Sequence, residues 1–298
     1  MSYRDERKQL LIEYLKSLNI EYKTDGKHKH VLAKKYTDLN IVPSIRKLGY
    51  KTVFNKKNTI ESISNEKNTF KLDSRANNIT SSSMLSACFF AYYVENQALL
   101  KQLITDLFLE RFNKRINIQN NVKVELEWID KNGDQSHIDA FVEFESDNES
   151  YRIFIEVKYC EEAYGPKKRY ERKSMTYERK LKAKEDYIES CKKWFSYHEK
   201  LLNLKGYMSD CVTANDFENS KYSQRYQIIR NVSHASLLAN DYCLFLLAKG
   251  NSEAVKDIYS GLEELKKQNE ELINKRVAVL FFEDVLDQKS DLYSKYFA

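Results

Sequence analysis

The sequence predicts an α/β fold, with a mixed central β-sheet flanked by helices. Two runs that alternate apolar and polar residues, and a third that is more apolar, follow one another over 122–159, which is typical of consecutive paired strands. Two later apolar runs of buried-strand type are separated by a long helical segment. Only 7 Gly and 2 Pro interrupt the 298 residues, so the elements should be long.

Residues 1–78 predict a small, mainly helical, basic N-terminal module. Leucine side chains recur on one face of an amphipathic helix over 5–18. Residues 31–50 predict two short helices that separate near Asn40–Pro43. Residues 51–80 are polar and weakly periodic, which indicates a loop or short strands. The role of this module stays open between contact with DNA and plain helical packing.

Residues 79–298 predict the larger domain, with the element order αβββαβ and a further helix and strand. Serines 81–83 offer N-caps for one apolar helix from about Met84 to Phe112. The turns KNGD and SDNES join the three strands. The expected elements after that helix are strands over 122–128, 137–145 and 151–159, a basic helical insertion at about 166–207, a helix over 225–239, a strand over 241–249, a helix over 252–275 and a strand over 276–285.

The positive charge is concentrated in two segments, although the net charge is only +5. Residues 1–75 carry 17 Lys and Arg against 9 Asp and Glu, and residues 166–207 carry 13 against 6. Basic segments beside an acidic remainder are typical of a phosphate-binding protein whose catalytic carboxylates lie apart from its phosphate contacts. The alternative for any single lysine is a solvated helix face.

Cysteine and histidine spacing argues against two kinds of site. The 5 Cys form no CxxC pair, and the 5 His lack the spacing of a zinc site, so neither a structural zinc nor a disulfide framework is expected. The charged N-terminus has no signal-peptide core, and the longest apolar run, Tyr242 to Ala248, is too short to cross a bilayer. We therefore expect a cytoplasmic protein without a membrane partner.

Three charged residues fall on two neighbouring predicted strands. Asp139 lies on the second strand, and Glu156 and Lys158 lie two residues apart on the third. Alternation along a strand places Glu156 and Lys158 on one face, and antiparallel pairing can bring Asp139 beside Glu156. The neighbours of Glu156 are apolar, so these charges should be buried, which is costly unless they pair or bind a metal.

Two buried carboxylates repel each other and favour a divalent cation. Oxygen ligands at this density suit Mg²⁺, with Mn²⁺ as a substitute, rather than zinc. Lys158 would then lie beside the metal, where it can orient or deprotonate a water for in-line attack on a phosphodiester. The alternative is a structural salt bridge of Lys158 with Glu156 or Asp139 in an ordinary sheet.

The spacing from Asp139 to Glu156-Val157-Lys158, on consecutive strands after a long helix, resembles the PD-(D/E)XK nuclease superfamily. Within it, EVKY followed by an acidic pair, and later YQIIRNVSHA, resembles a group of restriction endonucleases, over roughly residues 81–285. The resemblance implies that Asp139 and Glu156 are metal ligands, helped by the Val157 backbone carbonyl, and that Lys158 positions the attacking water. Ile138 stands where the superfamily usually has Pro.

The same resemblance implies that the helix over 225–239 leans over the site. Gln227 would support the site, as in the QxxxY motif of some relatives, although Asn231 replaces the Tyr of that motif. Arg230 would contact a phosphate. A surface or packing role is the alternative for all three residues.

The basic insertion is the expected contact with nucleic acid. It opens with Lys167, Lys168, Arg169 and Lys173, and further cations interleave with aromatic residues. Cations neutralise phosphates and aromatic rings can stack on bases, but these aromatic residues fit the core face of a helix equally well.

The prediction is a Mg²⁺-dependent DNA endonuclease for restriction or host defence. One site cuts one strand, so double-stranded DNA would call for a homodimer. The alternatives are a structure-specific or exonucleolytic nuclease and a non-catalytic nucleic-acid-binding subunit. Glu95 and Glu110 on the first long helix could each be a third acidic ligand or a solvated side chain, and Glu127 on the first strand is expected to be exposed.

Overall fold

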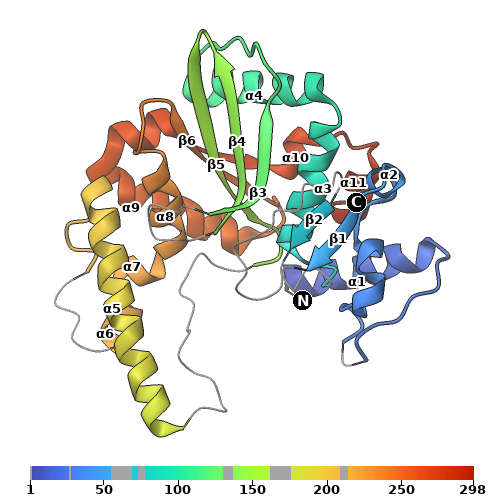
Figure 1. The fold of residues 1–298 in the computed structure, drawn as a ribbon, viewed down its shortest axis with the longest axis horizontal. Helices are drawn as coiled ribbons and strands as arrows, with labels where there is room; N and C mark the ends of the chain where they lie inside the picture. Colours follow the sequence, from blue (N-terminus) through green and yellow to red (C-terminus); the bar gives the residue numbers. More distant parts are fainter. Residues whose placement is uncertain are drawn as a thin grey trace.

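The computed structural model describes residues 2–26, 28–54, 69–72, 78–129, 137–161, 176–208 and 214–298. A five-stranded mixed sheet lies at its centre, in the order β3-β4-β5-β6-β7 (Figure 1). Neighbours pair antiparallel from β3 to β5 and parallel from β5 to β7. The predicted α/β class and mixed sheet are therefore confirmed. The strands are β3 (Lys123–Ile129), β4 (His137–Ser146), β5 (Glu149–Lys158), β6 (Asp241–Leu247) and β7 (Val277–Phe281).

Alternation along the strands divides the core between the two faces of the sheet. On β5, Ile153, Ile155 and Val157 pack into one hydrophobic cluster with helices α3 (Ser82–Val94) and α4 (Gln97–Phe112). On β6, Cys243, Phe245 and Leu247 pack into a second cluster with helices of the opposite layer. That layer contains α5 (Tyr177–Leu201), α8 (Tyr226–His234) and α9 (Ser252–Arg276). Helices thus contact both faces at the centre of the sheet, as the apolar residues of β5 and β6 require.

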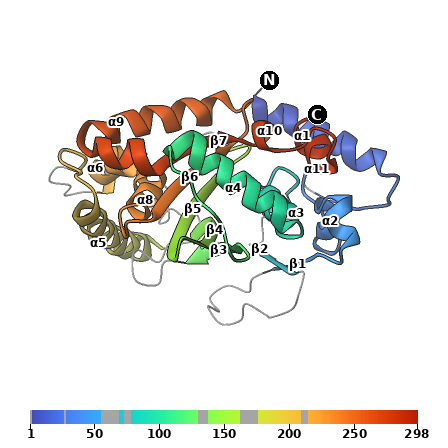
Figure 2. The ribbon, with the colours of Figure 1, turned by 90° about the horizontal axis from the view of Figure 1, so that it is seen from above.

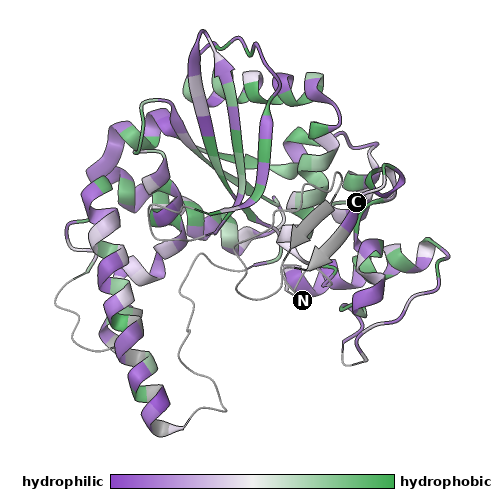
Figure 3. Cartoon of the chain, viewed as in Figure 1, coloured by the Kyte–Doolittle hydropathy of each residue, from purple (hydrophilic) through white to green (hydrophobic). Residues whose placement is uncertain are grey.

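Hydropathy follows these layers. Hydrophobic residues gather along the sheet and α3, whereas α5 carries mainly hydrophilic residues (Figure 3). Short helices complete the C-terminal half: α6 (Ala214–Asn219), α7 (Lys221–Gln224), α10 (Phe282–Val285) and α11 (Asp291–Tyr296). None of the described helices combines the length and apolar character needed to span a bilayer.

The N-terminal segment packs into the same core as the sheet. Its elements are α1 (Tyr3–Ser17), the 3-10 helix η1 (Lys34–Asn40), α2 (Pro43–Lys47) and the parallel strands β1 (Lys51–Phe54) and β2 (Thr69–Leu72). Leu11 and Leu15 of α1 join the cluster beneath β5, and α1 lies beside α11 (Figure 2). The two short helices and short strands confirm the predicted elements, while the domain boundary near residue 78 stays a prediction.

The predicted helix over 84–112 is two helices. Glu95 ends α3, and the Asn96 side chain accepts a hydrogen bond from the Leu99 backbone N–H at 3.2 Å, which caps α4. Asn competes with the helical backbone through such local bonds, so an uninterrupted apolar pattern does not secure one continuous helix. The turn between β4 and β5 agrees with its sequence, because Asp147 and Asn148 both have positive φ, as a two-residue hairpin turn requires.

Candidate active site

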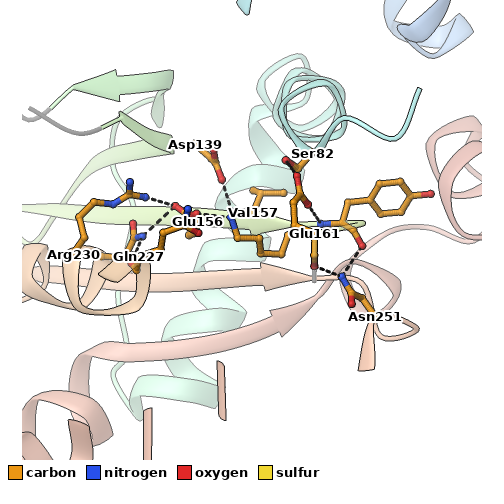
Figure 4. Close-up of polar contacts among 11 residues, drawn as sticks. Ser82, Asp139, Glu156, Val157, Glu161, Gln227, Arg230 and Asn251 are labelled. Carbon is orange, nitrogen blue, oxygen red and sulfur yellow. Dashed lines mark hydrogen bonds and ion pairs between the residues drawn. The ribbon is translucent and has the colours of Figure 1, made fainter. Parts of the chain in front are cut away.

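The site begins where the pairing of β4 and β5 ends. The last paired residues are Ala140 and Ile155, so a continued register would set Asp139 opposite Glu156. Instead, Asp139 Oδ2 accepts a hydrogen bond from the Val157 backbone N–H at 2.7 Å (Figure 4). A side-chain carboxylate thus takes the place of a ladder carbonyl, which fixes Asp139 next to the Glu156 segment.

Glu156 is held by three donors from two elements. Its Oε1 accepts from Lys158 Nζ at 2.8 Å, and its Oε2 accepts from Arg230 Nη2 at 2.6 Å and Asn231 Nδ2 at 3.1 Å. The exposed fractions are 3% for Glu156, 7% for Lys158, 6% for Arg230 and 0% for Asn231. These bonds therefore operate away from bulk water, where charge interactions are strong and unmatched charges are costly.

The two carboxyl groups differ in their electrostatic surroundings. Burial raises the pKa of the Asp139 carboxyl well above its usual range, and the nearby Glu156 charge raises it further. Burial also opposes ionisation of Glu156, but Lys158 and Arg230 outweigh it and lower the Glu156 pKa. Burial likewise disfavours charge on Lys158, yet Glu156 and then Glu161 keep its pKa above the usual value. The site therefore holds an ionised Glu156 and Lys158 next to a carboxyl that needs a positive partner.

Helix α8 turns one face toward these charges, as the resemblance implies. Gln227, Arg230 and Asn231 lie three and four residues apart and so share that face. Asn231 Nδ2 also donates to the Gln227 carbonyl at 2.7 Å, which holds the amide in place. The side-chain oxygens of Gln227 and Asn231 are buried without a hydrogen-bond partner among the described residues. Sequence reasoning noted Asn231 only as a departure from a motif, although its helical spacing from Gln227 indicated this position.

Two further carboxylates lie near the site in the part of the chain that the structure describes. Glu127 faces Asp139 across the register of β3 and β4, has a left-handed φ of 51°, and its charge also raises the Asp139 pKa. Its side chain is 20% exposed, so the expectation that it is exposed was wrong. Its position follows from pairing with β4, which the sequence of β3 alone does not reveal.

Glu161 lies just past the end of β5. Its carboxylate accepts from Ser82 Oγ at 2.5 Å and from the Tyr159 backbone N–H at 3.1 Å. Asn251 Nδ2 donates to the carbonyls of Tyr159 and Glu161, at 3.0 and 2.7 Å. The first residue of α3 and the N-cap of α9 thus fix the chain that follows Lys158, a role that only the tertiary contacts show (Figure 4).

One family of known proteins matches this chain over most of its length. The model of a family described as Restriction Endonuclease associating with ARP matches residues 9–298. The chain belongs to this family. No curated protein and no solved structure matches the chain. The restriction endonuclease family extends over the N-terminal helices as well as the sheet, in agreement with the core that they share.

Other residues predicted for the site lie elsewhere or are not described. Glu95 and Glu110 are exposed, Glu95 accepts a hydrogen bond from Tyr50 Oη at 2.7 Å, and no hydrogen bond or ion pair joins either of them to Asp139 or Glu156. Arg230 is buried on Glu156, and its predicted phosphate contact stays a prediction. The predicted phosphate contacts in the basic insertion, Lys167, Lys168, Arg169 and Lys173, lie outside the described residues.

Proposed function

We propose that this chain is a Mg²⁺-dependent DNA endonuclease of the PD-(D/E)XK type that acts in restriction or host defence. The observation that supports this most is the arrangement at the end of the β4–β5 pair, where Asp139 lies beside the Glu156 segment and Lys158 contacts Glu156. Membership of a restriction endonuclease family supports the same reaction class. The PD-(D/E)XK assignment, the metal and the DNA substrate are the parts that we propose.

The residues present fit a hard divalent cation. Asp139 has a raised pKa because it is buried near a second negative charge, so a cation at this position would be stabilised. Among the described residues, no group of three His, Cys, Asp or Glu side chains could hold a metal. Asp139 and Glu156 would therefore leave most of the coordination to other ligands, and Mg²⁺ usually keeps several waters and binds one or two carboxylates together with phosphate oxygens.

Asp139 and Glu156, with the Val157 carbonyl, would hold Mg²⁺, and Mn²⁺ would substitute for it. The Val157 N–H points to Asp139, and in a strand the carbonyl of the same residue faces the same neighbour. When bound, the cation supplies a more acidic water and charge stabilisation at the phosphate. Lys158, held at Glu156 and kept protonated by it, would donate a hydrogen bond that orients the attacking water. Gln227 and Asn231 would support Glu156 from α8.

Double-stranded DNA is the proposed partner. Lys167, Lys168, Arg169 and Lys173 would neutralise its phosphates, and a homodimer would supply the second site for the opposite strand. The family description also names an association with ARP, and we extend that association to this chain as part of the proposal.

One observation favours a second candidate, a nucleic-acid-binding subunit without catalysis. Both Glu156 oxygens already accept hydrogen bonds from cationic groups, which is the arrangement of a structural salt bridge. Such a subunit would bind DNA without cutting it in any divalent cation.

Incubation of the purified protein with circular and linear DNA tests these candidates. The proposal expects Mg²⁺-dependent breaks in circular plasmid that chelator and Asp139→Asn both prevent. Degradation of linear DNA alone would indicate an exonuclease instead. Intact DNA in both Mg²⁺ and Mn²⁺, with retained DNA binding, would contradict the nuclease and support the binding subunit.

A further inference from the structure

Arg230 occupies a position on Glu156 that a cation would need. Oε2 of Glu156 accepts two hydrogen bonds, from Arg230 Nη2 and Asn231 Nδ2, so both of its lone pairs are engaged. Among the donors of the described residues, Oε1 accepts a hydrogen bond from the Lys158 ammonium. A cation can therefore gain good access to Glu156 only if one of these donors moves.

Repulsion between positive charges selects the donor that moves. Lys158 and Arg230 both donate to Glu156, so a divalent cation that approaches Glu156 is repelled by both side chains. The other carboxylates around the site favour the added positive charge, so a cation that displaces one of these donors stays compensated. A phosphodiester brings negative charge and can accept two parallel hydrogen bonds from the Arg230 guanidinium. The Lys158 ammonium does not offer this geometry. Asn231 can stay on Glu156 because its amide is neutral and is fixed by the Gln227 carbonyl.

We propose that Arg230 exchanges Glu156 for a phosphodiester oxygen of DNA when the divalent cation binds, and thereby couples cation binding to DNA binding. This inference rests on the proposed nuclease function. It makes Arg230 a phosphate-binding residue only in the cation-bound protein. Without cation, Arg230 remains the counter-ion of Glu156 and is withheld from DNA.

DNA affinity in chelator tests the exchange directly. Glu156→Gln removes the carboxylate that retains Arg230, so affinity for a DNA duplex should rise about tenfold over wild type, as one charge-assisted hydrogen bond implies. The double variant Glu156→Gln/Arg230→Gln should lose most of that gain. It leaves neither member of the pair charged, so it avoids a buried unpaired guanidinium, and thermal melts would verify its fold. A matched control, Glu156→Gln/Lys275→Gln, removes an exposed cation of α9 and should keep the gain.

A second measurement concerns cation binding without DNA. Arg230→Gln removes the competitor for Glu156, so calorimetry should show Ca²⁺ binding about tenfold tighter than in wild type, and added DNA should raise that affinity less, because coupling is reciprocal. The exchange would be overturned if Glu156→Gln and Glu156→Gln/Arg230→Gln gained the same DNA affinity over wild type. It would also be overturned if Arg230→Gln bound Ca²⁺ no more tightly than wild type. Plasmid cleavage by wild type distinguishes failure of this exchange from failure of the proposed nuclease function. A protein that cuts in Mg²⁺ but shows either result loses only this inference, whereas one that neither cuts nor binds DNA loses the proposed function as well.

Discussion

Charged residues lie at both ends of strand β5, but the two groups differ in how fully their charges are compensated by partners. Near its start, Arg152 donates from Nε and Nη2 to the two oxygens of Asp241 at 2.7 and 2.5 Å, and the Leu238 N–H adds a third bond at 2.9 Å. At its end, Glu156 has its donors, but burial and the Glu156 charge raise the pKa of neighbouring Asp139. The Arg152–Asp241 pair thus has its charges compensated. At the Glu156 end, the Asp139 carboxyl would still be stabilised by an added positive charge.

This difference separates a structural ion pair from a candidate catalytic one on the same strand. Arg152 and Glu156 lie an even number of residues apart and so point to the same face of the sheet. The carboxylate of each pair is almost fully buried, although the Arg152 side chain is 25% exposed and that of Arg230 is 7% exposed, so burial of the carboxylate does not distinguish the pairs. What distinguishes them is the second carboxyl and the buried amide oxygens without partners at the Glu156 end, among the residues that the structure describes. Changes at each end should therefore affect different properties.

The largest expected effect is loss of cleavage at the Glu156 end. Asp139→Ala or Glu156→Ala should abolish Mg²⁺-dependent cleavage per folded molecule, because each removes a proposed metal ligand. Asp241→Asn is the matched control at the other end of β5, and it should cut at the wild-type rate per folded molecule. Single-turnover plasmid cleavage provides the measurement, and a wild-type rate in either alanine variant would show that the site is assigned wrongly.

Lys158→Ala separates the nuclease from the structural salt bridge. If Lys158 orients water, kcat should fall at least about 100-fold while Ca²⁺-supported DNA binding persists. If it only pairs with Glu156, stability should fall by about 3–5 kcal/mol with normal cleavage by the folded fraction. Melting temperature and single-turnover cleavage on one preparation distinguish these outcomes, and the second would rule out the proposed mechanism.

Substitutions at the Arg152 end of β5 should lower the stability of the protein. Asp241→Ala leaves Arg152 without its carboxylate and the Leu238 N–H without its acceptor, so unfolding free energy should fall by about 3–5 kcal/mol. Urea titration monitored by circular dichroism measures this loss. A loss below about 1 kcal/mol would mean that the pair is compensated by solvent, and the contrast between the two ends would weaken.

The basic segment should affect DNA affinity more gradually. Replacing Lys167, Lys168, Arg169 and Lys173 with Ala should reduce the slope of log affinity against log salt by roughly one unit for each phosphate that these side chains no longer neutralise. Fluorescence anisotropy over a salt series gives the slope. If the slope does not change, these cations belong to a solvated surface.

The smallest expected effect is a gain in stability at Asp139. Its folded pKa lies above the unfolded value, so as pH rises past the usual aspartate range the unfolded state releases the proton first, and wild type loses stability. In chelator, Asp139→Asn should therefore melt about 2 °C or more above wild type near neutral pH, and this gap should shrink as pH falls. Melting curves from pH 5 to 8 measure it. A gap of opposite sign, or one that grows toward low pH, would contradict the raised pKa.

The sequence by itself determined the strands and the shared face of Glu156 and Lys158. Those features are local, because the side chains of a strand alternate and a two-residue turn sets the β4–β5 register. Asp139 could therefore be predicted beside Glu156. The break of the first long helix at Asn96 was missed, because a single side-chain cap outweighed a continuous apolar pattern.

Only the tertiary structure decided which groups surround these three residues. Arg230 and Asn231 reach Glu156 from a helix more than 70 positions away, and their partner is set by how α8 rotates against the sheet. Glu127 likewise lies near the site through the pairing of β3 with β4, and the packing of α3 against the end of β5 fixes the Glu161 carboxylate. Such contacts depend on packing between distant segments, and that packing also determines which buried carboxyl has its charge compensated and which does not.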